Sequence, residues 1–154
     1  MNMEKIIKPS FVVIGKEGST NDGDGFIKAL WKDASDHFNE VEPLAKRDTN
    51  GNLEGFWGAM SDFSHSFKPW DNNFKCGLYL AGVECKEDAV PPPGWTKWEI
   101  PGFEYFRIQG VGHEIFTQGL TWLKNNGYSL AGAVHDFTDP TTKKNYQYYP
   151  IRKL

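Results

Sequence analysis

Asp136 is the side chain of this sequence whose surroundings best suit chemistry. It stands between His135 and Phe137 in a run that otherwise reads as a buried strand. Burial penalises an unpaired carboxylate and favours its neutral form, so a cation placed beside it would restore its charge. Strand alternation puts Val134 and Asp136 on one face and Phe137 on the other. We expect the Phe137 face to pack on helices and Asp136 to face a groove; a solvated strand acid is the alternative.

Three further acids are candidates for the same role. The pattern Gly-Ala-x-x-Asp-Phe occurs at residues 58–63 and again at 132–137, which makes Asp62 the counterpart of Asp136 in a tandem duplication. A turn role before the serine-rich segment 64–66 is the favoured alternative for Asp62. Glu84 and Glu104 lie on strands expected near the axis that relates the two halves, and either could supply the carboxylate instead.

Aromatic residues make up 15% of the chain, with Trp 6, Tyr 6 and Phe 11. Most such rings fill cores, but an excess of Trp and Tyr also suits a cavity for a flat apolar ligand. Tyrosines are favoured because a buried hydroxyl needs a partner. The pocket candidates are Trp57, Tyr79, Tyr105, Phe116, Tyr146 and Tyr148. A formal net charge of −3 disfavours nucleic-acid binding and suits a lipophilic cation as partner.

Other kinds of site lack their characteristic spacing. The four histidines show no zinc pattern, and the glycine-rich segment 15–25 lacks the glutamate of a calcium loop. No nucleophile elbow or phosphate loop occurs. We therefore expect neither metal nor cofactor. Cys76 and Cys85 are too far apart on one strand to form a disulfide, and we expect both to be reduced and buried.

The sequence also bears on location. Residues 1–10 lack the apolar core of a signal peptide, and no run approaches the roughly 20 apolar residues of a membrane span. We expect a cytoplasmic protein that makes no membrane contact.

The elements that must position these residues predict one α+β domain. Each half reads as βαββ, with repeat one at 1–89, a Pro-rich link at 90–94 and repeat two at 95–154. Helices are predicted at 26–41 and 112–126. Strands are predicted at 5–16, 56–63, 74–86, 95–109 (one strand, or two broken at Pro101-Gly102), 128–137 and 145–153. Two such units give an antiparallel sheet with two helices and a central ligand groove on the pseudo-two-fold axis.

The order of these segments resembles the GyrI-like superfamily over nearly the whole chain. The resemblance lies in YLAGVE at 79–84, IPGFEYFRIQGVGHEIFTQGLTWL at 100–123 and the closing GYSLAGAVHDF and NYQYYPIRK segments. That superfamily includes the effector-binding domains of bacterial AraC-type and MerR-type multidrug regulators. It also includes stand-alone integron-associated effector-binding proteins, which this chain resembles most.

The resemblance implies specific roles. Family members carry an acid, commonly Glu, on the strand after the second helix, at the floor of an aromatic pocket that faces lipophilic cations. This position falls on Asp136, one methylene shorter. A family tyrosine early in the last strand maps to Tyr146, and an aromatic near the start of the second helix maps to Phe116. With both helices assigned to the repeat, we expect no DNA-reading module.

The resulting hypothesis is a stand-alone effector-binding or drug-binding protein linked to transcription regulation, with a small organic ligand and a regulatory protein partner. One alternative is a small-molecule hydrolase in which Asp136 and Tyr146 position water. Another is a protein-interaction inhibitor of the gyrase-inhibitor type. Nothing in the local sequence favours catalysis over binding.

Overall fold

A computed structural model describes residues 2–154 of the chain. The strands are β1 (Glu4–Lys8), β2 (Phe11–Ser19), β3 (Phe56–Ser61), β4 (Leu78–Cys85), β5 (Thr96–Ile100), β6 (Phe103–Gln109), β7 (His135–Thr138) and β8 (Asn145–Lys153). The helices are α1 (Phe26–Asp36), α2 (Asp71–Phe74) and α3 (His113–Asn125), with 3-10 turns at Thr20–Asp22, Phe38–Glu40 and Glu42–Leu44. The predicted α+β class is confirmed.

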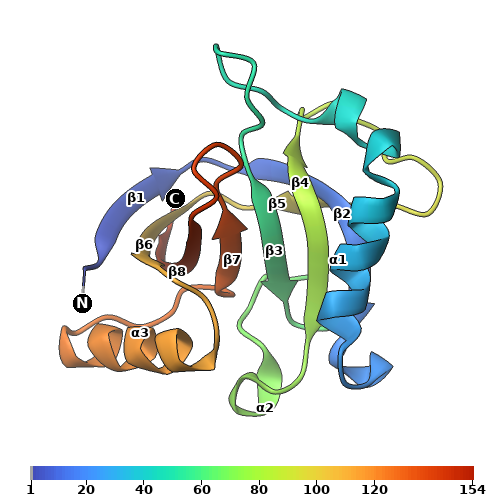
Figure 1. Ribbon diagram of the computed structural model, residues 1–154. Helices are drawn as coiled ribbons and strands as arrows, with labels where there is room; N and C mark the ends of the chain where they lie inside the picture. The colour runs from blue at the N-terminus through green and yellow to red at the C-terminus, as the bar shows by residue number, and fades with distance from the viewer. Residues whose placement is uncertain (1) are drawn as a thin grey trace.

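The eight strands form one sheet in the order β1-β6-β8-β7-β3-β4-β2-β5, and the strand pairs are antiparallel (Figure 1). This order is symmetric about the β7–β3 pair at its centre. The first strand of each half crosses to the other half: Lys8 of β1 lies opposite Phe103 of β6, and Ile100 of β5 lies opposite Phe11 of β2. The two halves are therefore interleaved, because each completes its part of the sheet with a strand from the other.

The two Gly-Ala-x-x-Asp-Phe copies lie at the central strand pair. Asp136 lies opposite Gly58 in the β3–β7 ladder, whereas Asp62 lies beyond the end of β3. Gly58 is inside a strand, but Gly132 precedes β7. The two Gly-Ala-x-x-Asp-Phe copies thus differ in secondary structure: Asp136 lies in a strand, whereas Asp62 lies just beyond one.

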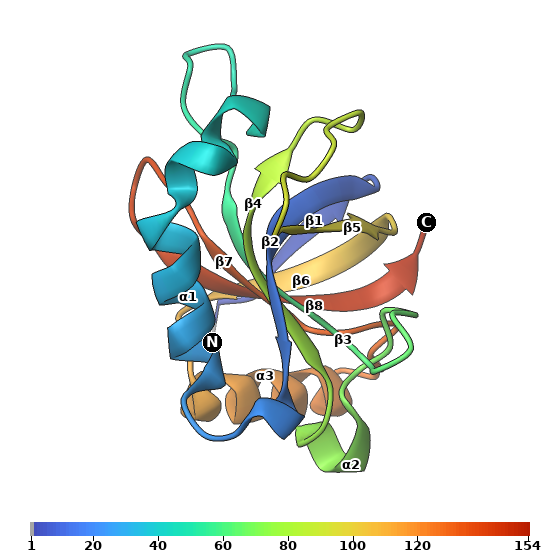
Figure 2. The same ribbon diagram turned by 90° about the vertical axis from the view of Figure 1, so that its right-hand side faces the viewer.

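Helices cover only one face of the sheet. Val12, Ile14 and Val83 pack against Ala34 of α1, while Phe106, Ile108 and Tyr149 pack against Leu123 of α3. In Figure 1, α1 runs alongside the first-half strands and α3 crosses near the ends of the second-half strands. The strong twist visible in Figure 2 curves the other face around an aromatic core that contains no residue of α1, α2 or α3. Its largest members are Phe11, Trp57, Trp98, Phe103, Tyr105, Phe137 and Tyr148.

Several predicted elements are shorter than expected, for local reasons. The strand predicted at 5–16 is two strands separated at Pro9-Ser10, since proline cannot donate to a ladder. The strand predicted at 74–86 begins at Leu78, because residues 72–74 have positive φ. The strand predicted at 128–137 is reduced to β7, because residues 128–134 carry the chain from α3 back to the sheet. Both cysteines are free. Cys85 is buried, as expected, whereas Cys76 is partly exposed.

Candidate functional site

A pocket of about 360 Å3 lies on the helix-covered face, between the first turns of α1 and α3. Strands β3, β7 and β8 form its floor, and the segment around α2 closes one side. Its principal lining residues are Ile27, Trp70, Phe74, Phe116, Asp136 and Gln147. Pockets for small organic molecules have this size and this apolar character, with few polar groups. We call it the Asp136 pocket.

Asp136 is the acid of this pocket and is held by a chain of hydrogen bonds. Gln147 lies directly opposite on β8, and its side-chain Nε2 donates to Asp136 Oδ1 at 3.2 Å. The hydroxyl of Tyr149 in turn donates to Gln147 Oε1 at 2.7 Å. Both partners are buried. Because Gln147 is fixed by Tyr149, its amide presents a donor to the carboxylate and orients it.

Burial raises the pKa of Asp136 to about 6, and the hydrogen bond from Gln147 opposes this shift. Within residues 2–154, no ion pair involves Asp136. At neutral pH the pocket thus holds a mostly buried carboxylate without a counter-ion. A cation bound beside it would favour the charged form and lower the pKa.

Tyr79 lies beside this acid. Its hydroxyl accepts a hydrogen bond from Trp31 Nε1 of α1 at 3.0 Å, and burial, followed by the Asp136 charge, raises the pKa of Tyr79 above its usual value. The hydroxyl lies directly over Gly58, where a Cβ would collide with it. Glycine at this position therefore lets the tyrosine cross the strand at the centre of the groove.

Aromatic rings form the wall of the pocket near α3. Phe116 contacts Phe74 edge-to-face with ring centroids 5.1 Å apart, and it stacks on Tyr149 at 6.3 Å. Phe74 and the two asparagines before it have left-handed backbone, which is unusual for a bulky residue. The Trp70 indole anchors this segment by donating to the carbonyl of Leu78 at 2.9 Å. The pocket wall is thus built by α3 and by a turn with an uncommon backbone.

The sequence expectation about strand faces was wrong in one respect. Asp136 does face a groove, but this is the face that the helices cover, and the groove lies between them. Phe137 points to the opposite face, where its ring contacts Trp57 at 4.6 Å and Tyr148 at 5.4 Å. Alternation correctly separated the two residues, but the side on which the helices pack was assigned incorrectly.

The predicted aromatic residues are consequently divided between two places. Phe116 lines the pocket and Tyr79 borders it, whereas four others lie on the aromatic-core face. The four are Trp57, Tyr105, Tyr146 and Tyr148. Tyr146 packs under the guanidinium of Arg107, 4.4 Å from its ring centroid, instead of lining the Asp136 pocket. The structure therefore does not bring Tyr146 together with Asp136.

The other predicted acids have structural partners outside the pocket. Glu84 is buried, accepts from Trp57 Nε1 at 3.0 Å and pairs with Lys8 at 3.2 Å. Glu104 pairs with Arg152 at 3.4 Å.

Asp62 accepts hydrogen bonds from the hydroxyls of Ser61, Ser64 and Ser66. Burial alone would raise the pKa of Asp62, but these serine donors hold it below its usual range. Its role is to fasten the turn, as the alternative interpretation proposed.

Sequence reasoning missed Gln147, Trp31 and Tyr149. A signal for Gln147 was present: it is a polar residue between two tyrosines in a strand that pairs with the acid's strand. Tyr146 and Tyr148, which were predicted instead, lie on the face of β8 that points away from the pocket. The residues that face the pocket and α3 are Gln147 and Tyr149.

Among residues 2–154, no group of three or more His, Cys, Asp and Glu side chains could hold a metal ion. No helix of this part of the chain is long and apolar enough to cross a membrane. What the pocket offers is aromatic surface around one oriented carboxylate.

Three solved structures share this fold. The EcmrR–DNA complex in EcmrR-RPo matches with a TM-score of 0.66 and 12% sequence identity, and the match covers 99% of this chain and 58% of the EcmrR chain. SAV2435 bound to tetraphenylphosphonium matches with a TM-score of 0.65 and 10% sequence identity, and the match covers 99% of this chain and 94% of the SAV2435 chain. The Vibrio cholerae integron cassette protein VCH_CASS2 matches with a TM-score of 0.58 and 14% sequence identity, and the match covers 99% of this chain and 97% of the cassette protein.

The fold is the one that the GyrI-like resemblance predicted. This chain spans a little over half the length of the EcmrR chain. No protein-family model and no curated protein sequence matches the chain. At identities of 10–14%, these likenesses establish the fold alone.

Proposed function

We propose that this protein is a small-molecule effector-binding domain that captures lipophilic organic cations in the Asp136 pocket. The observation that carries the proposal is a mostly buried, oriented carboxylate without a counter-ion, enclosed by aromatic walls. A compact hydrated cation would lose its water here with little compensation. A bulky cation with spread charge loses less on desolvation and gains contact with the rings.

The energetics are sufficient for useful affinity. Burying about 300 Å2 of apolar ligand surface at about 25 cal/mol per Å2 contributes roughly 7 kcal/mol before association costs. Those costs remove several kcal/mol, so apolar contact alone gives weak binding. Charge pairing with Asp136 then separates cations from neutral molecules of the same shape.

The likeness to EcmrR and SAV2435 supports a place in regulation. The EcmrR structure is a DNA complex, and the SAV2435 structure holds a lipophilic cation. We propose that this chain senses or sequesters such a compound and passes the signal to a regulatory protein partner. The proposed location is the bacterial cytoplasm.

The test compares tetraphenylphosphonium with the neutral triphenylphosphine oxide by calorimetric titration at pH 7.5. We expect the wild-type protein to prefer the cation and Asp136→Asn to lose that preference while retaining the neutral compound. Asp88→Asn, which removes an exposed acid, is the matched control and should bind like wild type. Equal weakening of both compounds in Asp136→Asn would refute charge pairing, as would cation binding that survives the substitution.

A hydrolase remains the second candidate because an acid with a pKa of about 6 suits proton transfer near neutral pH. Asp136 and Tyr146 lie on opposite faces of the sheet, and Tyr79 is a tyrosine beside the acid. Turnover of a reactive ester that Tyr79→Phe abolishes while Tyr146→Phe preserves it would favour this candidate. Absence of turnover across a panel of activated esters would leave binding as the function.

A further inference from the structure

A second pocket, of about 440 Å3, lies farther along α1 on the same face of the sheet. Its lining shares no residue with the Asp136 pocket, although α1, β3 and β7 contribute to both. We call it the Trp95 pocket, after the tryptophan that follows the Pro-rich link and forms part of its wall. The two pockets are neighbours in one groove.

Tyr79 and Trp31 separate these pockets. On β3, Phe56 lines the Trp95 pocket and Met60 lines the Asp136 pocket, while Gly58 lies between them on the same face. The Tyr79 hydroxyl occupies the space over Gly58 and is held there by the indole N–H of Trp31. A ligand in one pocket therefore meets this hydrogen-bonded pair before it reaches the other.

The lining of the Trp95 pocket is aromatic and uncharged. Four rings contribute to it, and its side-chain polar groups other than indole are two hydroxyls. The rings belong to Trp31, Phe38, Phe56 and Trp95, and the hydroxyls to Ser35 and Thr138. A charged ligand would be desolvated here without an opposite charge among the lining residues. A flat, neutral molecule would gain ring contacts at no such cost.

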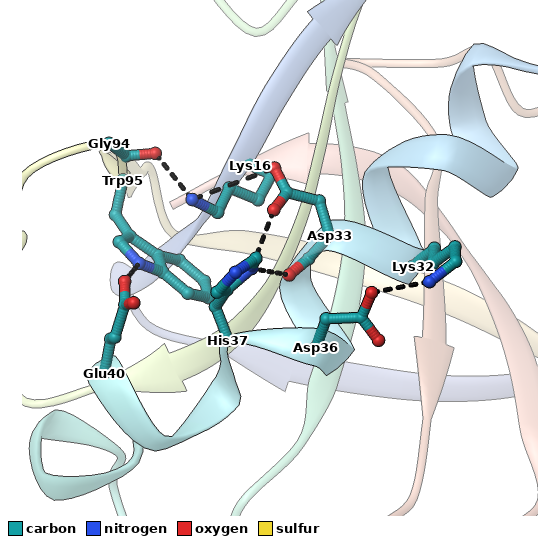
Figure 3. Close-up of polar contacts among 8 residues, drawn as sticks. All are labelled: Lys16, Lys32, Asp33, Asp36, His37, Glu40, Gly94 and Trp95. Atoms are coloured by element: carbon teal, nitrogen blue, oxygen red, sulfur yellow. Dashed lines mark hydrogen bonds and ion pairs between the residues drawn. The ribbon is translucent and has the colours of Figure 1, made fainter.

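Polar contacts hold the Trp95 ring in place, as Figure 3 shows. Its Nε1 donates to Glu40 Oε1 at 2.9 Å, and the Lys16 ammonium lies 4.3 Å from the ring centroid. Lys16 also donates to the carbonyl of Gly94 at 2.9 Å and lies 3.8 Å from Asp33. These contacts tie the end of the Pro-rich link to α1 and β2. A wall held in place in this way loses little entropy when a ligand binds.

We infer that the Trp95 pocket is a second binding site, for neutral planar aromatic molecules, which acts independently of the cation site. It requires neither Asp136 nor a positive charge on the ligand. The inference thus goes beyond the proposed function, and one site can fail experimentally while the other holds.

The probe for this site is N-phenyl-1-naphthylamine, a neutral compound whose fluorescence rises in apolar surroundings. We expect saturable binding to wild type and unchanged binding to Asp136→Asn. Ser35→Trp places a ring at the exposed rim of the pocket and should weaken the probe by at least about tenfold. Ala29→Trp adds the same ring at an exposed α1 position outside the lining and should bind like wild type.

Competition gives a measurement that depends on no variant. Saturating tetraphenylphosphonium should leave the naphthylamine bound, and circular dichroism should show that Ser35→Trp is folded. Displacement of the probe by the cation would overturn the inference, because one pocket would then serve both. Failure of the probe to bind wild type, or full binding to a folded Ser35→Trp, would also overturn it.

Discussion

Replacing Asp136 by asparagine should stabilise the protein at neutral pH. The ordinary pKa of this carboxyl is 3.8 and the folded value is about 6, a rise caused chiefly by burial. Each unit of difference corresponds to about 1.4 kcal/mol, so the ionised carboxylate costs the folded state roughly 3 kcal/mol above pH 6. Asparagine carries no charge, and its side-chain oxygen can still accept the hydrogen bond from Gln147.

The direction of the pH dependence follows from the raised pKa. Below about pH 4 the carboxyl is protonated in both the folded and the unfolded chain, and its contribution to stability is complete. As the pH rises from 4 to 6, the unfolded chain releases its proton while the folded protein still holds its own, so this stability is lost, and the loss is complete above pH 6. The advantage of Asp136→Asn should be close to zero at pH 4, grow between pH 4 and 6, and level off above pH 7.

Urea denaturation of both proteins at pH 4, 5, 6, 7 and 8 measures this difference directly. The neighbouring His135 also titrates, but it is present in both proteins and cancels from the comparison. A variant less stable than wild type at pH 7 would refute the reasoning. A difference that does not change with pH would do the same, because it would place the effect in packing and not in charge.

Three other outcomes are expected. Burial lowers the pKa of His135 from 6.5 to about 3, so its contribution to the stability of the fold is complete above pH 6.5 and is lost as the pH falls. His135→Gln should therefore reduce the loss of stability in acid, as measured by urea denaturation. A pH profile identical to that of wild type would contradict this. Gly58→Ala forces the Tyr79 hydroxyl away and should lower the free energy of unfolding by about 2 kcal/mol, with a changed tryptophan emission spectrum. In a Tyr79→Phe background the same substitution should lower it by less, and full additivity of the two substitutions would contradict the contact. The affinity for the cation should increase about tenfold for each unit that the pH rises up to 6 and level off above pH 6, as titration calorimetry can measure. Because His113 also lines the pocket, His113→Gln is the control. Loss of the pH dependence in that variant would assign it to the histidine instead of Asp136.

The sequence was sufficient for the class of fold, and it singled out Asp136 as the first candidate acid. The order of strands and helices predicted an α+β domain, and an acid between His135 and Phe137 in an apolar strand made Asp136 the first of four candidates. Both inferences rest on local information, namely periodicity along the chain and the contrast between a residue and its neighbours. Phe116 was found by resemblance, at the expected start of the second helix.

The rest of the site depends on contacts between distant segments. Alternation divides β7 and β8 into two faces, but it does not say which face the helices cover, since both faces of this sheet are apolar. Tyr146 was predicted instead of Gln147 because the sequence does not show which face of β8 the helices cover. Trp31 and Tyr79 meet across 48 positions of the chain, and only the packing of α1 on the sheet brings them together.

The pairing of β1 with β6 and of β5 with β2 also depends on contacts between distant segments. Each strand pairs with a strand of the other half, in a register that no neighbouring residue encodes. The sequence by itself determined roughly where most strands and helices lie and which acid to suspect first, because these depend on the side chains nearby. Tertiary structure decided which face holds the pockets, because that depends on how much apolar surface each helix can bury against each side of the sheet.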